Sequence, residues 1–194
     1  MRRKIITLLL LCFATIGFSY AQKVAVKHNF AYDALFAPNL GIEFSLGDRV
    51  TLDTQYSNNT FVFRKQDRLP EWSHWLAQSE VRYWTCESFN GLFFGLHALG
   101  GQFRIGHVNI PFVLENKNSV MKNQRYIGWY YGGGLSVGYQ WVLSPRSSIE
   151  LSVGGGYARI DYNKCTACGY KNSEASANYV GPTKATLSYI FFFK

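Results

Sequence analysis

Beyond its first 21 residues, the sequence lacks any apolar run long enough to form a transmembrane helix. The longest later runs, such as residues 189–193, have only the length of a β-strand. Charge is also scarce, since Asp, Glu, Lys and Arg together make up 16% of the chain, whereas aromatic residues make up 17%. The surface of a dissolved protein usually carries more charge than this. The composition therefore favours a surface that contacts lipid.

Recognisable catalytic, metal and nucleic-acid motifs are missing too. No set of His, Ser and Asp residues suggests a hydrolase, no set of four ligands suggests a structural zinc site, and no motif suggests nucleic-acid binding. We therefore expect no cofactor, no metal and no nucleic-acid partner. A lipid A or phospholipid-modifying enzyme stays open as an alternative, because His74, or His107 with Ser119, could supply a base or nucleophile near an outer rim. The other two histidines are His28 and His97.

The N-terminus has the pattern of a secretory signal peptide. Arg2, Arg3 and Lys4 precede an apolar run from Ile5 to Phe18, and the small-residue site Ser19-Tyr20-Ala21 follows. The pattern predicts a cleaved signal peptide over residues 1–21 and a single domain over residues 22–194. The run is short for a membrane anchor, and large residues precede Cys12 where a lipoprotein site needs small ones. Cleavage would remove three of the 20 basic residues and none of the 12 acidic ones, leaving a net charge of +5.

Alternation of large apolar and small or polar residues runs through the rest of the chain. In YIGWYYGGGLSVGYQWVL (126–143), large residues occupy nearly every second position and glycine or small polar residues lie between them. A period of two predicts β-strands, and no helical period competes with it. We expect eight strands, over residues 23–32, 39–46, 49–57, 74–85, 92–104, 126–143, 148–160 and 179–193.

The expected connections alternate in length. Short turns join the second strand to the third, the fourth to the fifth and the sixth to the seventh, whereas longer loops make the other four connections, including residues 161–178. Short turns at one end and longer loops at the other are typical of outer-membrane barrels. The sequence thus predicts an all-β fold, a closed up-and-down eight-stranded antiparallel transmembrane β-barrel.

The small and polar face separates this fold from a soluble periplasmic binding barrel, which also alternates. That face is mostly Gly, Ser, Thr and Gln, as suits the narrow interior of an eight-stranded barrel and not a surface in water. The large face would then meet lipid. Aromatic residues on it are expected to form girdles at the two membrane interfaces: Trp129, Tyr131, Tyr139, Trp141, Tyr157 and Tyr189.

Five blocks of the sequence resemble an uncharacterised family of small outer-membrane β-barrel proteins from Bacteroides-like Gram-negative bacteria. The blocks are PNLGIEF, EVRYWTCESFNGLFFGLHALGGQF, YIGWYYGGGLSVGYQW, GYARIDYNKCTACG and YVGPTKATLSYIF. The chain departs from the family in having Ser79 where proline is expected and in ending with Lys194 in place of an aromatic residue. The resemblance implies an outer-membrane location and genes near fimbrial operons, but it brings no activity and no catalytic residues.

Seven charged residues fall on the inward face of the predicted barrel: Lys27, Glu43, Asp53, Glu80, Arg82, Glu150 and Lys184. They could line a pore or form an ion-pair network that fills the lumen. We favour the network, because the interior of an eight-stranded barrel has little width left for water and unpaired charges there are costly.

The expected loops offer two further features. Cys165 and Cys168 form CTAC, which we interpret as a short disulfide in the last loop, although a metal or redox role stays open. The three longest loops carry more basic than acidic residues, which would suit lipopolysaccharide phosphates or simply an anionic leaflet. We expect an integral outer-membrane protein without an open pore and without enzymatic activity. Its loops would serve a structural, adhesion or fimbria-associated role, with lipid, lipopolysaccharide and surface or fimbrial proteins as partners.

Overall fold

The computed structural model describes residues 24–34, 36–59, 71–106, 124–166 and 171–193; the predicted signal peptide, residues 1–21, lies outside them. The described residues form strands and one short helix. In chain order these are β1 (Val24–Asn29), α2 (Phe30–Asp33), β2 (Asn39–Ser45), β3 (Val50–Asn59), β4 (Glu71–Trp84), β5 (Gly91–Gly106), β6 (Gln124–Ser144), β7 (Ser147–Thr166) and β8 (Lys171–Phe193).

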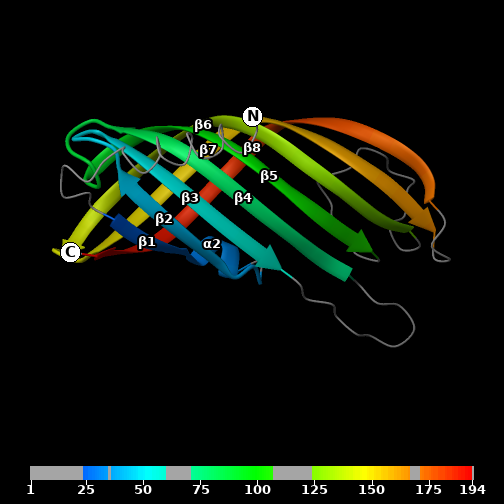
Figure 1. The fold of residues 1–194 in the computed structure, drawn as a ribbon, viewed down its shortest axis with the longest axis horizontal. Coiled ribbons are helices and arrows are strands. Elements are labelled where there is room, and N and C mark those ends of the chain that lie inside the picture. The colour runs from blue at the N-terminus through cyan, green and yellow to red at the C-terminus, as the bar shows by residue number, and fades with distance from the viewer. Residues whose placement is uncertain (1–23, 35, 60–70, 107–123, 167–170, 194) are drawn as a thin grey trace, which may run out of the picture.

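All eight strands belong to one sheet in which each strand pairs with the next in sequence (Figure 1). Every pairing is antiparallel, and β1 also pairs with β8, so that the sheet closes on itself as a barrel. Closure leaves no strand without a neighbour at the seam, where an open sheet would expose unpaired backbone groups. The predicted all-β fold, an up-and-down sheet of eight antiparallel strands closed in a ring, is confirmed.

The two faces of the sheet follow the alternation in the sequence. On β6, Leu135 is 69% exposed and Val137 is 40% exposed, whereas Ser136 between them is 7% exposed. The same alternation appears on the other strands, for example Glu80 and Arg82 inside against Val81 and Tyr83 outside on β4. The interior is therefore polar and the exterior apolar, the reverse of a protein that folds around an apolar core.

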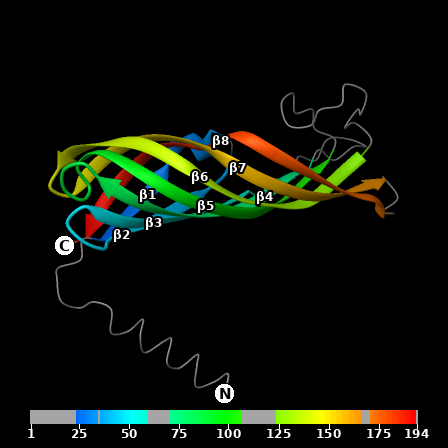
Figure 2. The same ribbon diagram turned by 90° about the horizontal axis from the view of Figure 1, so that it is seen from above.

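The strands grow longer along the chain, from six residues in β1 to 23 in β8. The short connections 46–49, 85–90 and 145–146 lie together at one end of the barrel, which we call the turn end. The opposite end is the loop end, where β6, β7 and β8 reach well past the short strands β1 and β2 (Figures 1 and 2).

The first strand is shorter than predicted. We expected it over residues 23–32, but it ends at Asn29 and the helix α2 begins at once. The Asn29 side chain explains the change, because its Oδ1 accepts a hydrogen bond from the Ala31 backbone N–H at 3.0 Å, as an N-cap does. The prediction that the chain contains strands and no helix is therefore wrong for these four residues.

The last connection is also shorter than predicted. Residues 161–178 were expected as a long loop, but β7 continues to Thr166 and β8 starts at Lys171. Asp161 pairs with Ser176 and Asn163 with Glu174, so polar residues occupy the outward face, which carries large apolar residues farther along these strands. Because large apolar residues no longer occupy every second position here, the sequence pattern does not predict strands in this segment.

Candidate functional site

The seven charged residues predicted for the interior lie side by side inside the barrel. They come from the inward face of β1 (Lys27), β2 (Glu43), β3 (Asp53), β4 (Glu80 and Arg82), β7 (Glu150) and β8 (Lys184). Each is at most 4% exposed. Because inward positions from all sides of a closed sheet face the same axis, closing the ring brings these side chains into one cluster, which we call the lumen network.

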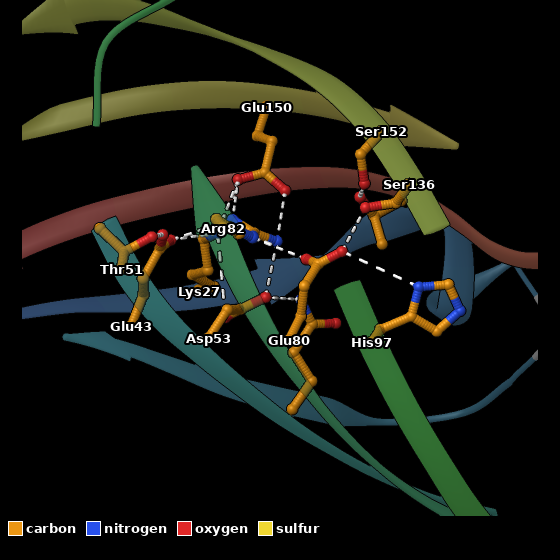
Figure 3. A network of polar contacts seen from close by, with 12 residues as sticks. Lys27, Glu43, Thr51, Asp53, Glu80, Arg82, His97, Ser136, Glu150 and Ser152 are labelled. Atoms are coloured by element: carbon orange, nitrogen blue, oxygen red, sulfur yellow. Dashed lines mark hydrogen bonds and ion pairs between the residues drawn. The ribbon is translucent and has the colours of Figure 1, made fainter. Parts of the chain in front are cut away.

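Arg82 is the centre of the lumen network, as Figure 3 shows. Its guanidinium nitrogens lie 2.6 Å from Glu80 Oε2 and 2.7 Å from Asp53 Oδ2. They also lie 3.0 Å from Glu43 Oε2 and 2.8 Å from Glu150 Oε2. One planar group with five N–H donors thus binds carboxylates from four different strands, which a lysine could not do.

The two lysines complete the ion pairs on either side of Arg82. Lys27 Nζ lies 2.5 Å from Glu43 Oε2 and 2.6 Å from Glu150 Oε2, so it joins β1 to both β2 and β7. Lys184 Nζ donates a hydrogen bond to Glu80 Oε2. Each carboxylate therefore has at least one cation within contact distance, as a buried charge requires.

Uncharged side chains add hydrogen bonds to three of the four carboxylates. Thr51 donates to Glu43 Oε1 at 2.5 Å, Gln55 donates to Asp53 Oδ2 at 2.8 Å, and Ser136 donates to Glu80 Oε1. Gly95 lies against the Glu80 carboxylate and the Ser136 hydroxyl, where an added Cβ would collide with both groups. The small residues of the inward face thus leave room for the carboxylates.

The network holds four negative and three positive side chains. His97 lies beside it, with Nδ1 4.0 Å from Glu80 Oε1 and Nε2 2.8 Å from Thr183 Oγ1. The charges therefore nearly cancel within the barrel, which limits the cost of burying them.

Aromatic side chains fill the interior between the lumen network and the turn end. Trp84 is fully buried, donates its indole N–H to Thr51 Oγ1 at 2.9 Å, and lies 4.8 Å from the Phe93 ring centre. Phe89, in the turn between β4 and β5, is 3% exposed and points into the barrel mouth, where it contacts Phe192. The backbone φ of Phe89 is 69°, a left-handed conformation that is costly for a phenylalanine.

Hydrogen bonds hold that turn in place. The Ser88 hydroxyl donates to the Gly47 carbonyl at 2.7 Å, and the Ser88 N–H donates to the Asp48 carbonyl at 2.7 Å. The turn between β4 and β5 is therefore tied to the turn between β2 and β3, and it carries Phe89 across the opening. Together, the aromatic cluster and the lumen network place side chains across the interior at two successive levels.

The carboxylates of the lumen network are all engaged in ion pairs. Arg82 and the two lysines bind them, and each of the four acidic residues is at most 2% exposed. Within the described ranges, no group of three His, Cys, Asp or Glu residues could hold a metal ion. The same ranges contain no helix long and apolar enough to cross a membrane.

Residues 6–193 match the DUF3575 family, which is described as proteins of unknown function. The match covers nearly the whole chain. This protein belongs to the DUF3575 family. The predicted resemblance to an uncharacterised family is thereby confirmed. The searches of curated proteins and of solved structures found no match.

In this DUF3575 member, the aromatic residues predicted for the girdles all lie on the exterior. Each is between 39% and 53% exposed: Trp129, Tyr131, Tyr139, Trp141, Tyr157 and Tyr189. Tyr139 and Trp141 lie near the turn end of β6, and Trp129 and Tyr131 lie towards its loop end. Their rings are separated along the strand by residues such as Leu135 and Val137.

The remaining candidates lie apart from the lumen network. Cys165 is near the end of β7, where only the backbone is described, and Cys168 lies outside the described residues, so the expected disulfide stays a prediction. His107 and Ser119 also lie outside them. His74 is on β4 and pairs with Asn59 of β3, away from the charged cluster. Among the described residues, His74 therefore lies apart from the lumen network.

Sequence reasoning missed three contributors to the interior. Thr51 and Ser136 belong to the small and polar face, where the sequence pattern does not show that each donates a hydrogen bond to a buried carboxylate. Phe89 lies in the short turn after the fourth strand, among the polar residues Glu87, Ser88 and Asn90, which do not indicate an interior position. Alternation shows which face a residue occupies on a strand, but a turn has no alternation, so nothing in the sequence marked Phe89 as an interior residue.

Proposed function

We propose that this chain is an integral outer-membrane protein whose barrel crosses the lipid bilayer and is closed to ions. Its loop end would present surface contacts on the outside of the cell, for adhesion, for assembly of fimbria-like surface structures or for envelope integrity. The observation that carries the proposal is the reversed distribution of residues, with seven charges buried inside and large apolar side chains exposed outside. Such an exterior is costly in water and favourable in lipid.

The outward face supports a bilayer-spanning band. Outward-facing residues are uncharged over residues 75–83 of β4, 92–102 of β5, 127–143 of β6 and 149–157 of β7. Each stretch is at least as long as the roughly 9–11 residues that a tilted strand needs to cross a bilayer. Arg104 and Arg159 are the first outward charges beyond these stretches on β5 and β7, and both lie towards the loop end.

The closed interior supports a role other than transport. Arg82 and its carboxylates fill the middle of the barrel, and Trp84 and Phe89 fill the turn end. A narrow eight-stranded barrel packed in this way has no continuous water path. The proposed partners are therefore those that meet the exterior and the loop end, namely outer-membrane lipid, lipopolysaccharide and surface or fimbrial proteins, after export directed by a cleaved signal peptide.

A pair of arginine substitutions tests the membrane location directly. Leu135→Arg places a charge in the middle of the apolar band, where about 2–4 kcal/mol of folding stability in a bilayer is expected to be lost. Tyr157→Arg places the same charge two residues from Arg159, where a much smaller loss is expected. A protein that instead works dissolved in the periplasm would tolerate both substitutions alike and would not stay with the membrane after carbonate extraction.

The alternative, a lipid-modifying enzyme, predicts a different phenotype. We propose no catalytic role, so a deletion strain is expected to keep the acylation and phosphate pattern of its outer-membrane lipids. An altered pattern that the wild-type gene restores and a His74→Ala gene does not would contradict this proposal. Cross-linking in intact cells, followed by identification of the captured protein, would identify the partner of the loop end.

A further inference from the structure

A pocket of about 500 Å³ lies on the barrel towards the loop end, where β6, β7 and β8 extend past the shorter strands. Its walls include the Trp129 ring and the polar side chains of Arg159 and Asp161. Trp129 and Asp161 are directly paired across β6 and β7, and Arg159 is paired with Tyr131, the next outward residue along β6. The pocket thus combines an exposed aromatic surface with two charged groups in adjacent rows of the sheet.

The Trp129 ring is held in place and is open to a ligand. It is 52% exposed, and the Trp75 ring packs against it edge-on, with centroids 5.7 Å apart and an interplanar angle of 83°. An edge contact fixes the orientation of a ring while the rest of its surface stays available for stacking. A ring that is already ordered loses little side-chain entropy when a ligand stacks on it.

Arg159 and Asp161 provide hydrogen-bonding groups without a net charge. Arg159 Nε donates to Asp161 Oδ1 at 3.2 Å, and each side chain is nearly half exposed. The guanidinium keeps further N–H donors and the carboxylate keeps a second acceptor oxygen. Because the two charges offset each other, a phosphate would gain little here, whereas a ligand with both hydroxyl donors and acceptors could use both groups.

We propose that this pocket binds an uncharged sugar ring. The C–H face of a pyranose would stack on the Trp129 indole, and neighbouring hydroxyl groups would bond to the Arg159 guanidinium and the Asp161 carboxylate. Shallow pockets that join one apolar surface to a few oriented polar groups select ligands of this mixed character. The sugar could belong to a glycolipid in the surrounding leaflet or to a free oligosaccharide, since both present the same chemistry.

The inference goes beyond the proposed function and rests on it only in placing the pocket at the loop-end edge of the apolar band, where Trp129 meets Arg159 and Asp161. Binding can be measured with the full protein in detergent solution by isothermal titration, with maltotriose, mannotriose and triacetylchitotriose as uncharged probes and glucose 6-phosphate as an anionic one. At least one uncharged probe is expected to bind saturably. Failure to bind would overturn this inference but not the membrane proposal, which fractionation tests separately.

Two variants and one matched control sharpen the test. Trp129→Ala is expected to weaken uncharged-sugar binding about tenfold or more, equivalent to about 1.4 kcal/mol. Trp141→Ala, which removes a tryptophan of similar exposure (44% against 52%) near the turn end of the same strand, is expected to leave sugar binding unchanged. Asp161→Ala is expected to weaken sugar binding and to strengthen binding of glucose 6-phosphate, because it leaves the Arg159 charge without its counter-ion.

The possible results of these binding experiments lead to different conclusions. Equal losses from Trp129→Ala and Trp141→Ala, or binding of glucose 6-phosphate alone by the wild type, would overturn the inference. Vesicles with and without a neutral diglucosyl lipid distinguish the two sources of the sugar. Competition between this lipid and the soluble trisaccharide would support a pocket that binds membrane sugars, whereas trisaccharide binding unaffected by the lipid would support a free glycan. A circular dichroism spectrum like that of the wild type establishes that each variant is folded.

Discussion

Removing the guanidinium of Arg82 should destabilise the barrel more than any loss of an exposed charge. Arg82 lies between 2.6 and 3.0 Å from carboxylates on β2, β3, β4 and β7. Its guanidinium carbon also lies 4.5 Å from the centre of the Phe93 ring, a cation–π contact. In Arg82→Ala, four buried carboxylates would face only two lysines. Breaking one buried ion pair typically costs about 3–5 kcal/mol, so we expect a loss at or above that range.

Urea unfolding in lipid vesicles, followed by tryptophan fluorescence, measures this loss. Arg146→Ala is the matched control, because Arg146 is exposed in the turn between β6 and β7, and its loss should change the unfolding free energy by less than about 1 kcal/mol. Arg82→Lys should be intermediate, since a lysine keeps the charge but cannot bind four carboxylates.

A double variant separates loss of charge balance from loss of packing. Arg82→Ala combined with Glu150→Gln restores the original difference of one between negative and positive side chains, so part of the lost stability should return. An Arg82→Ala protein as stable as the wild type would refute the reasoning, because it would mean that the carboxylates reach water or that they are held by other groups.

Three further predictions concern the closed interior, the glycines and the topology. In planar bilayers, the purified wild type should show no steady large conductance, and ohmic channels would contradict a filled lumen. Gly134→Val should impair folding severely, because its Cβ would crowd the Gly155 and Gly156 backbone, whereas Gly100→Val should fold, because its Cβ would meet nothing closer than 3.8 Å; yields of folded protein and melting curves compare the two. Cys86 lies at the turn end and should form no disulfide with Cys165 at the loop end, since a disulfide needs Cα atoms within about 7 Å. Mass spectrometry of non-reduced protein checks this, and a Cys86–Cys165 peptide would contradict the topology.

The strands and their faces could be predicted because burial on a closed sheet imposes a strict period of two. Leu135 and Ser136 illustrate the principle, since their exposures of 69% and 7% follow directly from their places in the alternation. A shift of one residue would turn every side chain on the strand to the opposite face. The pattern therefore determines the register wherever one face is apolar.

The sequence could not reveal features that depend on local or three-dimensional detail. The helix α2 arises from a single cap at Asn29, which interrupts an otherwise strand-like pattern. The central position of Arg82 depends on which inward residues of the other strands lie at the same height along the barrel axis. The tilt of the strands determines that height, and the sequence does not show the tilt. The interior position of the Phe89 side chain depends on a left-handed backbone conformation that few phenylalanines adopt.

The six-residue seam between β1 and β8 has a consequence for the order of folding. The other strand pairings join neighbours along the chain and can form one hairpin after another, but Val24 pairs with Phe193, and bringing these two residues together carries the largest loop-closure entropy. Lys27 on β1 contacts Glu43 and Glu150, which lie on opposite sides of that seam. In a sheet that has not yet closed, Lys27 could not contact both carboxylates. For this reason we expect folding intermediates in which only some strands have paired to be unstable. Ring closure and charge neutralisation should then occur in the same late kinetic step.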